Sequence, residues 1–153
     1  MIRVLFLSMI FLCACSELKE APLPADTFFE MSIAGKKFTA QLAISDYEQG
    51  KGLMHRKSLG EDETMIFVYS VPKKMSFWMK NTFINLDLAF FDKTGKLLEI
   101  KSLYAHNLDS VKSTSDKVLY AIEANESWFD KNKIKVGDTL DLTLLNKAIS
   151  KRK

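Results

Sequence analysis

Residues 29–44 read FEMSIAGKKFTAQLAI, and this stretch decides the fold class. Apolar side chains alternate with polar ones on both sides of Ala34-Gly35, a dipeptide typical of a two-residue turn. Alternation with a period of two residues places the apolar side chains on one face of a strand. The stretch therefore predicts a β-hairpin with one buried face.

The rest of the chain continues this pattern of short strands separated by turns. Further strands are expected at residues 65–69, 75–79, 86–91, 97–103, 118–124 and 140–145, and a polar loop at residues 105–117. Ser45 and Glu48 form a capping box that predicts a short helix, and a second helical turn is expected near residues 128–131. We therefore expect a mostly β (α+β) domain: a compact, mainly antiparallel β-barrel or sandwich of about eight strands with two short helical insertions.

The length and composition agree with one packed domain. The chain has 153 residues, of which 47% are hydrophobic, with 11 Phe, 4 Tyr and 2 Trp. The net charge of +3 is too small to indicate a nucleic-acid partner. Both cysteines, Cys13 and Cys15, lie near the amino terminus, which leaves the folded part without a disulfide, a thiolate nucleophile or a cysteine-bound metal.

The amino-terminal residues have the features of an exported lipoprotein. Residues 1–14 contain Arg3 followed by an apolar segment that is too short to span a bilayer as a helix, which is typical of a secretory signal peptide. Residues 12–16 (LCACS) resemble a bacterial lipobox, and this resemblance implies that Cys15 carries acyl chains such as palmitate. The alternative is an ordinary cleaved signal followed by a coincidental cysteine.

These features divide the chain and predict its location. We expect a signal peptide at residues 1–14, a lipidated tether at 15–27, one β-rich domain at 28–146 and a basic tail at 147–153. The membrane is then a partner through the lipid on Cys15, and the protein lies in the cell envelope. In a Gram-negative host, Ser16 after the lipidated cysteine favours the periplasmic side of the outer membrane. The basic tail is expected to be solvated, with contact to anionic lipid as the alternative.

Two predicted strands each carry one carboxylate within an apolar run. Asp87 shares a face with Ala89, and Glu123 shares a face with Leu119 and Ala121. A buried carboxylate needs a cation or hydrogen-bond donors, or its pKa rises until the group is neutral. The two acids are therefore candidate site residues. The alternative interpretation is that they face water or form structural ion pairs.

Polar residues in two other segments are the expected partners of these acids. Arg56 follows the first short helix, and a guanidinium suits bidentate binding of a carboxylate. Trp78, Asn81 and Thr82 place an aromatic ring beside an amide and a hydroxyl. Such a set suits a pocket for a sugar or another small polar ligand. It equally suits a turn that caps a hydrophobic core.

Several of these segments together resemble a known family. The blocks are GLMHR at 52–56, MIFVY at 65–69, FWMKNT at 77–82, LDLAFF at 86–91, AIE at 121–123 and GD at 137–138. In order and spacing they resemble the signature blocks of the domain of unknown function 192, over residues 28–145. The chain departs from the pattern at Thr64 and near Ser127, where the family usually has glycine. The resemblance implies a small β-rich domain, often exported or lipid-anchored, with no established activity.

The sequence motifs of most enzyme classes are absent. There is no Gly-rich phosphate loop, no cysteine cluster for a metal and no His-Glu-x-x-His segment. The two histidines, His55 and His106, are far apart in the sequence, so no metal site is expected. No other cofactor is expected either.

Three functions remain open on the sequence alone. The leading hypothesis is a noncatalytic, lipid-anchored binding domain for a small polar ligand or an envelope protein, with a polar cleft formed by Arg56, Trp78, Asn81, Thr82, Asp87 and Glu123. The second is a glycosidase-like envelope hydrolase, which requires the carboxyl groups of Asp87 and Glu123 to lie ~5–10 Å apart across an open groove. The third is a structural or interaction domain in which the polar cluster only stabilises the fold.

Overall fold

The computed structural model of the chain describes residues 21–153. The predicted signal peptide, Cys15 with its predicted lipid, and residues 16–20 of the predicted tether lie outside the described residues. None of the helices within residues 21–153 combines the length and the apolar character that a membrane crossing requires.

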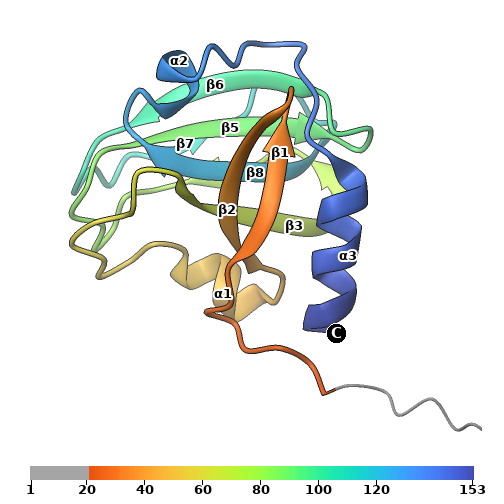
Figure 1. Ribbon diagram of the computed structural model, residues 1–153. Helices are drawn as coiled ribbons and strands as arrows, with labels where there is room; N and C mark the ends of the chain where they lie inside the picture. Colours follow the sequence, from red (N-terminus) through yellow and green to blue (C-terminus); the bar gives the residue numbers. More distant parts are fainter. Residues whose placement is uncertain (1–20) are drawn as a thin grey trace, which may run out of the picture.

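The described residues form eight strands and three short helices (Figure 1). In chain order they are β1 (Phe29–Ile33), β2 (Lys36–Ala43), α1 (Asp46–Lys51), β3 (Glu63–Lys73), β4 (Ser76–Phe77), β5 (Leu86–Asp92), β6 (Leu97–Leu103), β7 (Val111–Lys112), β8 (Val118–Asn125), α2 (Trp128–Lys131) and α3 (Leu142–Arg152). The mostly β character predicted from the sequence is therefore confirmed.

Six of the strands form one mixed sheet in the order β1-β2-β3-β8-β5-β6, and β4 pairs with β7 in a separate two-stranded sheet. The pair β2–β3 is parallel, because the chain crosses over through α1 between these strands, and the other pairs are antiparallel. β1 and β6 are the outer strands and do not pair with each other. The large sheet is therefore open, and the described residues form no closed barrel, contrary to one of the predicted architectures.

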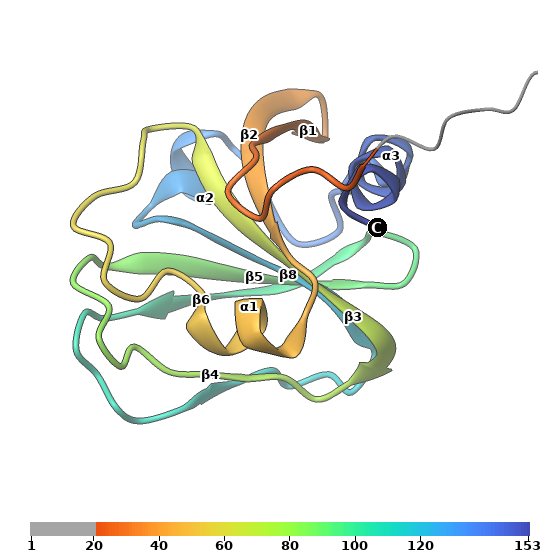
Figure 2. The ribbon, with the colours of Figure 1, turned by 90° about the horizontal axis from the view of Figure 1, so that it is seen from below.

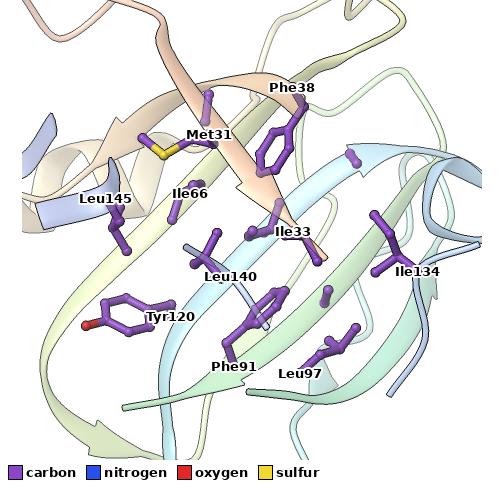
Figure 3. Packing of buried hydrophobic residues seen from close by; sticks show 14 of the residues in the cluster. Met31, Ile33, Phe38, Ile66, Phe91, Leu97, Tyr120, Ile134, Leu140 and Leu145 are labelled. Atoms are coloured by element: carbon purple, nitrogen blue, oxygen red, sulfur yellow. The ribbon is translucent and has the colours of Figure 1, made fainter. Parts of the chain in front are cut away.

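One face of the large sheet carries the larger apolar core (Figure 3). Alternate residues of β1 and β2, among them Met31, Ile33 and Phe38, point to this face. Leu145 and Ala148 of α3 cover it at one end. The ring of Phe38 packs edge-on against Trp128 of α2, and the α2 segment covers the face at the other end.

The opposite face packs against β4 and the segment that follows α1. Phe67 of β3 and Phe90 of β5 contact Phe77 of β4 with ring centroids 4.9 and 5.8 Å apart. Leu53 and Met79 are buried in the same cluster. Figure 2 shows β4 on one side of the sheet and α2 and α3 on the other, so elements cover the sheet on both faces.

The local predictions for the start of the domain are confirmed. Ala34 and Gly35 both have positive φ (48° and 86°), as in the type I′ turns that join two-residue hairpins. Ser45 and Glu48 form the predicted capping box of α1, which ends before Gly52.

The end of the chain differs from the prediction. Leu140 forms only an isolated bridge with Ile33, and most of residues 140–153 form α3 instead of a strand and a tail. Asp141 caps this helix, since its carboxylate accepts hydrogen bonds from the N–H groups of Thr143 and Leu144 (2.8 and 3.2 Å). The predicted loop at 105–117 also contains a short strand, β7.

The described part of the predicted tether lies against α3. The N–H of Leu23 donates to the carbonyl of Lys151 (2.7 Å), and the guanidinium of Arg152 donates to the carbonyl of Leu23 (2.8 Å). Arg152 also forms an ion pair with Glu48 of α1. The chain therefore approaches the domain next to the carboxyl end of α3 (Figure 1).

Candidate functional site

Glu123 lies on β8 and points to the face of the sheet that packs against β4. Its strand partners are Met65 of β3 and Leu88 of β5, and only 5% of its surface is exposed. No hydrogen bond from the described residues reaches its carboxyl group. Burial raises the pKa of Glu123 to about 8, and the nearby charge of Arg56 opposes this rise. Glu123 is therefore mainly a neutral carboxylic acid at pH 7.

A cavity of about 160 Å³ borders Glu123. Its lining includes Trp78 and Thr82 of the predicted set, together with Gly52 and Tyr69. Thr82 is buried, whereas Trp78 is 49% exposed. Burial and the charge of Glu123 raise the pKa of Tyr69 to about 12, so the phenol is close enough to respond to the carboxyl group. The cavity thus combines an indole ring, a phenol, an aliphatic hydroxyl and a carboxyl group.

Backbone hydrogen bonds join the loops that carry the matched motifs. The N–H of His55 donates to the carbonyl of Asn81 (2.7 Å), and the N–H of His106 donates to the carbonyl of Thr82 (3.1 Å). His55, Asn81 and His106 all have positive φ (66°, 54° and 64°). Non-glycine residues in this conformation are uncommon and often occur at functional sites. The loop contacts fix the backbone on which Thr82 is carried.

Gly52 lies beside both Glu123 and Phe67. It is the C-cap of α1 with φ 47° and ψ −133°, a conformation that is unfavourable for residues with a Cβ atom. A Cβ at this position would lie 3.3 Å from the ring of Phe67 and 3.8 Å from Oε2 of Glu123. Glycine is therefore required here by the turn, and its small size keeps the carboxyl group accessible from the cavity.

Arg56 lines a second cavity of about 380 Å³, not the cavity of Glu123. Its Nη2 donates to Oε1 of Gln41, and Nε2 of Gln41 donates to the backbone carbonyl of Asp26 (2.7 Å). Three residues line both cavities: Lys51, Gly52 and Met54. Arg56 is therefore adjacent to the Glu123 cavity and acts on it through its charge.

Asp87 lies on the opposite face of the sheet from Glu123. Leu88 is the strand partner of Glu123, so the preceding residue on β5 points to the other side. Burial raises the pKa of Asp87, and hydrogen bonds from the backbone N–H groups of Ser127 and Phe129 oppose this rise. The two acids do not share a groove, and the predicted cleft does not include Asp87.

The structure thus brings together part of the predicted set. Trp78, Thr82 and Glu123 share one cavity, and Arg56 lies in the next. Asn81 is exposed and contributes its backbone carbonyl to the loop contact. Three residues that the sequence analysis did not select complete the region: Gln41, Gly52 and Tyr69. Within residues 21–153, no group of three or more His, Cys, Asp or Glu side chains is arranged to hold a metal ion.

The family assignment rests on a match over almost the whole domain. Residues 29–142 match the family DUF192, which is described as an uncharacterised ACR. This chain belongs to the DUF192 family. Among curated proteins, no sequence matches it.

Two solved structures are similar to this DUF192 domain. A protein of unknown function from Novosphingobium aromaticivorans has a TM-score of 0.70 and 28% sequence identity, covering 79% of this chain and 91% of that one. A protein from Sinorhizobium meliloti, whose description proposes a transcription regulator, has a TM-score of 0.71 and 25% identity, covering 75% of this chain and 93% of that one. These similarities extend over most of the DUF192 domain and name no ligand.

Proposed function

We propose that this DUF192 domain is a noncatalytic binding module for a small polar ligand, such as a sugar unit of an envelope glycan, and that lipid on Cys15 holds it at the cell envelope. The supporting observation is that Glu123 is only 5% exposed, yet its carboxyl group borders a cavity and receives no hydrogen bond from the described residues. A buried polar group without a partner is costly, so such a group is retained where a ligand can supply one.

The chemistry of the cavity favours a ligand with several hydroxyl groups. A neutral carboxylic acid both donates and accepts a hydrogen bond, and the hydroxyl of Thr82, which donates to the carbonyl of Lys80 (3.3 Å), can accept one. Trp78 adds a half-exposed aromatic surface on which the apolar side of a sugar ring can pack. The site therefore offers an apolar face together with orienting hydrogen bonds.

The hydrolase hypothesis receives no support from this geometry. Acid and base catalysis of glycosidic cleavage needs two carboxyl groups on either side of one bond. Asp87 and Glu123 point to opposite faces of the sheet, and the carboxyl group of Asp87 accepts hydrogen bonds from the backbone of α2. A purely structural role fits Asp87 but leaves the unpartnered carboxyl group of Glu123 unexplained.

The location is proposed from the sequence and can be tested separately. Lipid on Cys15 anchors the domain, on the periplasmic side of the outer membrane if the host is Gram-negative. Mass spectrometry of the purified protein should find acyl chains on Cys15, and Cys15→Ser should release the domain from the membrane fraction. An unmodified amino-terminal cysteine in the mature protein would contradict the anchor.

Binding is tested by NMR titration of the Cys15→Ser chain with chitooligosaccharides and muropeptide fragments as probes. Glu123→Leu removes the hydrogen-bonding group and should weaken binding at least tenfold, which corresponds to about 1.4 kcal/mol. Glu123→Gln should retain binding at pH 7, because an amide also donates and accepts hydrogen bonds. Glu61→Gln changes an exposed acid outside the cavity and is the matched control.

The pH dependence identifies the group that contacts the probe. Wild-type affinity should fall as the pH rises through about 8, because Glu123 then loses its proton. Of the groups that act on it, Arg56 stays charged, and Tyr69 stays neutral since its pKa is about 12. Glu123→Gln should bind equally at pH 7 and pH 9. If no probe shifts the resonances of the cavity, or if Glu123→Leu binds as well as wild type, the proposed function is wrong.

A further inference from the structure

The second cavity, beside Arg56, has the features of an anion site. It measures about 380 Å³, and its lining includes Arg56, Lys51 and Gln41. Tyr47, which is 78% exposed, also lines it. It adjoins the Glu123 cavity through the residues that line both, Lys51, Gly52 and Met54.

Most hydrogen-bond donors of Arg56 are unused within the described part of the chain. A guanidinium has five N–H groups, and the only described acceptor for Arg56 is Oε1 of Gln41. No carboxylate of residues 21–153 lies within ion-pair distance of Arg56, and the charge of Arg56 acts on the pKa of Glu123 from farther away. A half-buried guanidinium with free donors is suited to bind a planar or tetrahedral anion.

Gln41 holds Arg56 in this orientation. Gln41 is a buried amide, 4% exposed, on the face of β2 that also carries Ala43, beside Met65 of β3. Its oxygen accepts from Arg56, and its nitrogen donates to the carbonyl of Asp26 (2.7 Å). Both ends of the amide are therefore used to position one guanidinium, which is the kind of support that a preorganised binding residue needs.

The acidic groups at this cavity leave the positive charge available. Glu48 accepts hydrogen bonds from the N–H groups of Ile44 and Ser45 and forms an ion pair with Arg152. Asp26 is the other acid in the lining, and its backbone carbonyl, not its carboxylate, contacts Gln41. Asp26 is therefore the one acid at this cavity whose carboxylate has no described partner. Most of the positive charge of Arg56 and Lys51 remains available to a ligand.

We propose that the Arg56 cavity binds an anionic group, a carboxylate or a phosphate, of the same ligand whose hydroxyl groups contact Glu123. The ligand class is then an acidic sugar: a sugar carboxylate or a sugar phosphate. This inference rests on the proposed function, because it assigns a second group of the same ligand to the adjoining cavity.

The inference is tested by calorimetric titration of the Cys15→Ser chain with glucose, glucuronate, glucose 6-phosphate and inorganic phosphate. At least one of the two charged sugars should bind ten or more times as tightly as glucose. Comparing the affinities of glucuronate and glucose 6-phosphate then shows whether carboxylate or phosphate is preferred. Arg56→Ala should remove this preference and leave the affinity for glucose. Lys57→Ala removes an adjacent, exposed positive charge and should keep the preference, as a matched control.

Lys51→Ala provides a second variant at an exposed position, in case Arg56→Ala lowers the stability of the domain. It should weaken binding of the charged sugars several-fold more than binding of glucose. Equal affinity for glucose and both charged sugars, or a charge preference that survives in Arg56→Ala, would overturn the inference while leaving the proposed function in place. Arg56-dependent binding of phosphate without binding of any sugar would support the anion site and refute the proposed sugar-binding function. If none of the four probes binds, both the anion site and the proposed sugar-binding function are wrong.

Discussion

The two faces of the central sheet each bury one carboxyl group, and the two groups have opposite surroundings. Asp87 is 7% exposed and Glu123 is 5% exposed, so their burial is nearly equal. Backbone N–H groups of Ser127 and Phe129 donate to Asp87, whereas the charge of Arg56 is the only described influence that favours ionised Glu123. Burial alone therefore does not mark a functional acid. The hydrogen-bond partners decide between a structural role for Asp87 and a ligand-binding role for Glu123.

The largest expected effect is on the pH dependence of stability, and it comes from Glu123. The folded state holds the proton of Glu123 up to a pKa of about 8, whereas an unfolded chain releases it near the ordinary value of 4.5. Between these values the folded state binds more protons, so the free energy of unfolding falls as the pH rises, by up to about 1.4 kcal/mol per pH unit. Denaturant unfolding from pH 4 to pH 9 measures this slope.

Glu123→Gln isolates the contribution of this one group. Once the remaining groups are accounted for, Glu123→Gln should unfold at the same denaturant concentration at pH 5 and at pH 8, whereas the wild type loses stability over this range. The variant should therefore exceed the wild type in stability increasingly above pH 5. The raised pKa of Asp87 acts in both proteins and cancels in the difference. A constant difference between wild type and variant over this range would mean that Glu123 is ionised in the folded state.

The next largest effect is expected at Asp87. Asp87→Ala leaves the N–H groups of Ser127 and Phe129 at the start of α2 without their acceptor, which should lower the free energy of unfolding by about 2 kcal/mol and the melting temperature by roughly 4–8 °C. Asp87→Asn keeps an acceptor oxygen and should lose less. Probe binding in the Glu123 cavity should be unchanged in both variants. Weaker binding with normal stability would place Asp87 in the site after all.

The sequence predicted those parts of the fold that depend on local pattern. The alternation in residues 29–44 predicted the first hairpin, and Ser45 with Glu48 predicted the start of α1. The open sheet was not predictable in this way, because the parallel pairing of β2 with β3 depends on contacts between distant segments. At residues 140–145 the apolar alternation suggested a strand, but the capping carboxylate of Asp141 favoured a helix.

The sequence predicted the residue types of the site better than their grouping. Period-two alternation correctly placed Asp87 with Ala89, and Glu123 with Ala121, on their respective faces. It did not relate the faces of separate strands to each other, because that requires the register between β5 and β8. Gln41 had a detectable signal as an amide within the apolar residues of β2. Its role in positioning Arg56 depends on contacts over long sequence separation.

Substitution of Gly52 tests whether the backbone conformation of this residue keeps the cavity beside Glu123 open. Gly52→Ala should lower the free energy of unfolding by about 1–3 kcal/mol, because its φ of 47° is unfavourable with a Cβ, and should weaken probe binding because the methyl group approaches Glu123. Gly50→Ala is the matched control two residues earlier. A Cβ at Gly50 has no neighbour within 4 Å, so this variant should gain up to about 1 kcal/mol of stability; because Gly50 also lines the cavity, it controls for stability and not for binding. Normal binding in Gly52→Ala would show that the cavity does not need this glycine.

The smallest expected effect compares two tyrosines on opposite faces of the sheet, the half-buried Tyr69 and the buried Tyr120. Burial and the charge of Glu123 together raise the pKa of Tyr69 to about 12, whereas burial alone raises the pKa of Tyr120. In Glu123→Gln the carboxylate is absent, so the pKa of Tyr69 should fall while remaining above its ordinary value of 10, and the pKa of Tyr120 should not change. NMR titration of ¹³Cζ-labelled tyrosine resolves the two residues. Equal shifts of both tyrosines would point to a general loosening of the variant, and a shift confined to Tyr69 would place its phenol and the carboxyl group of Glu123 in one electrostatic environment, as a shared ligand cavity requires.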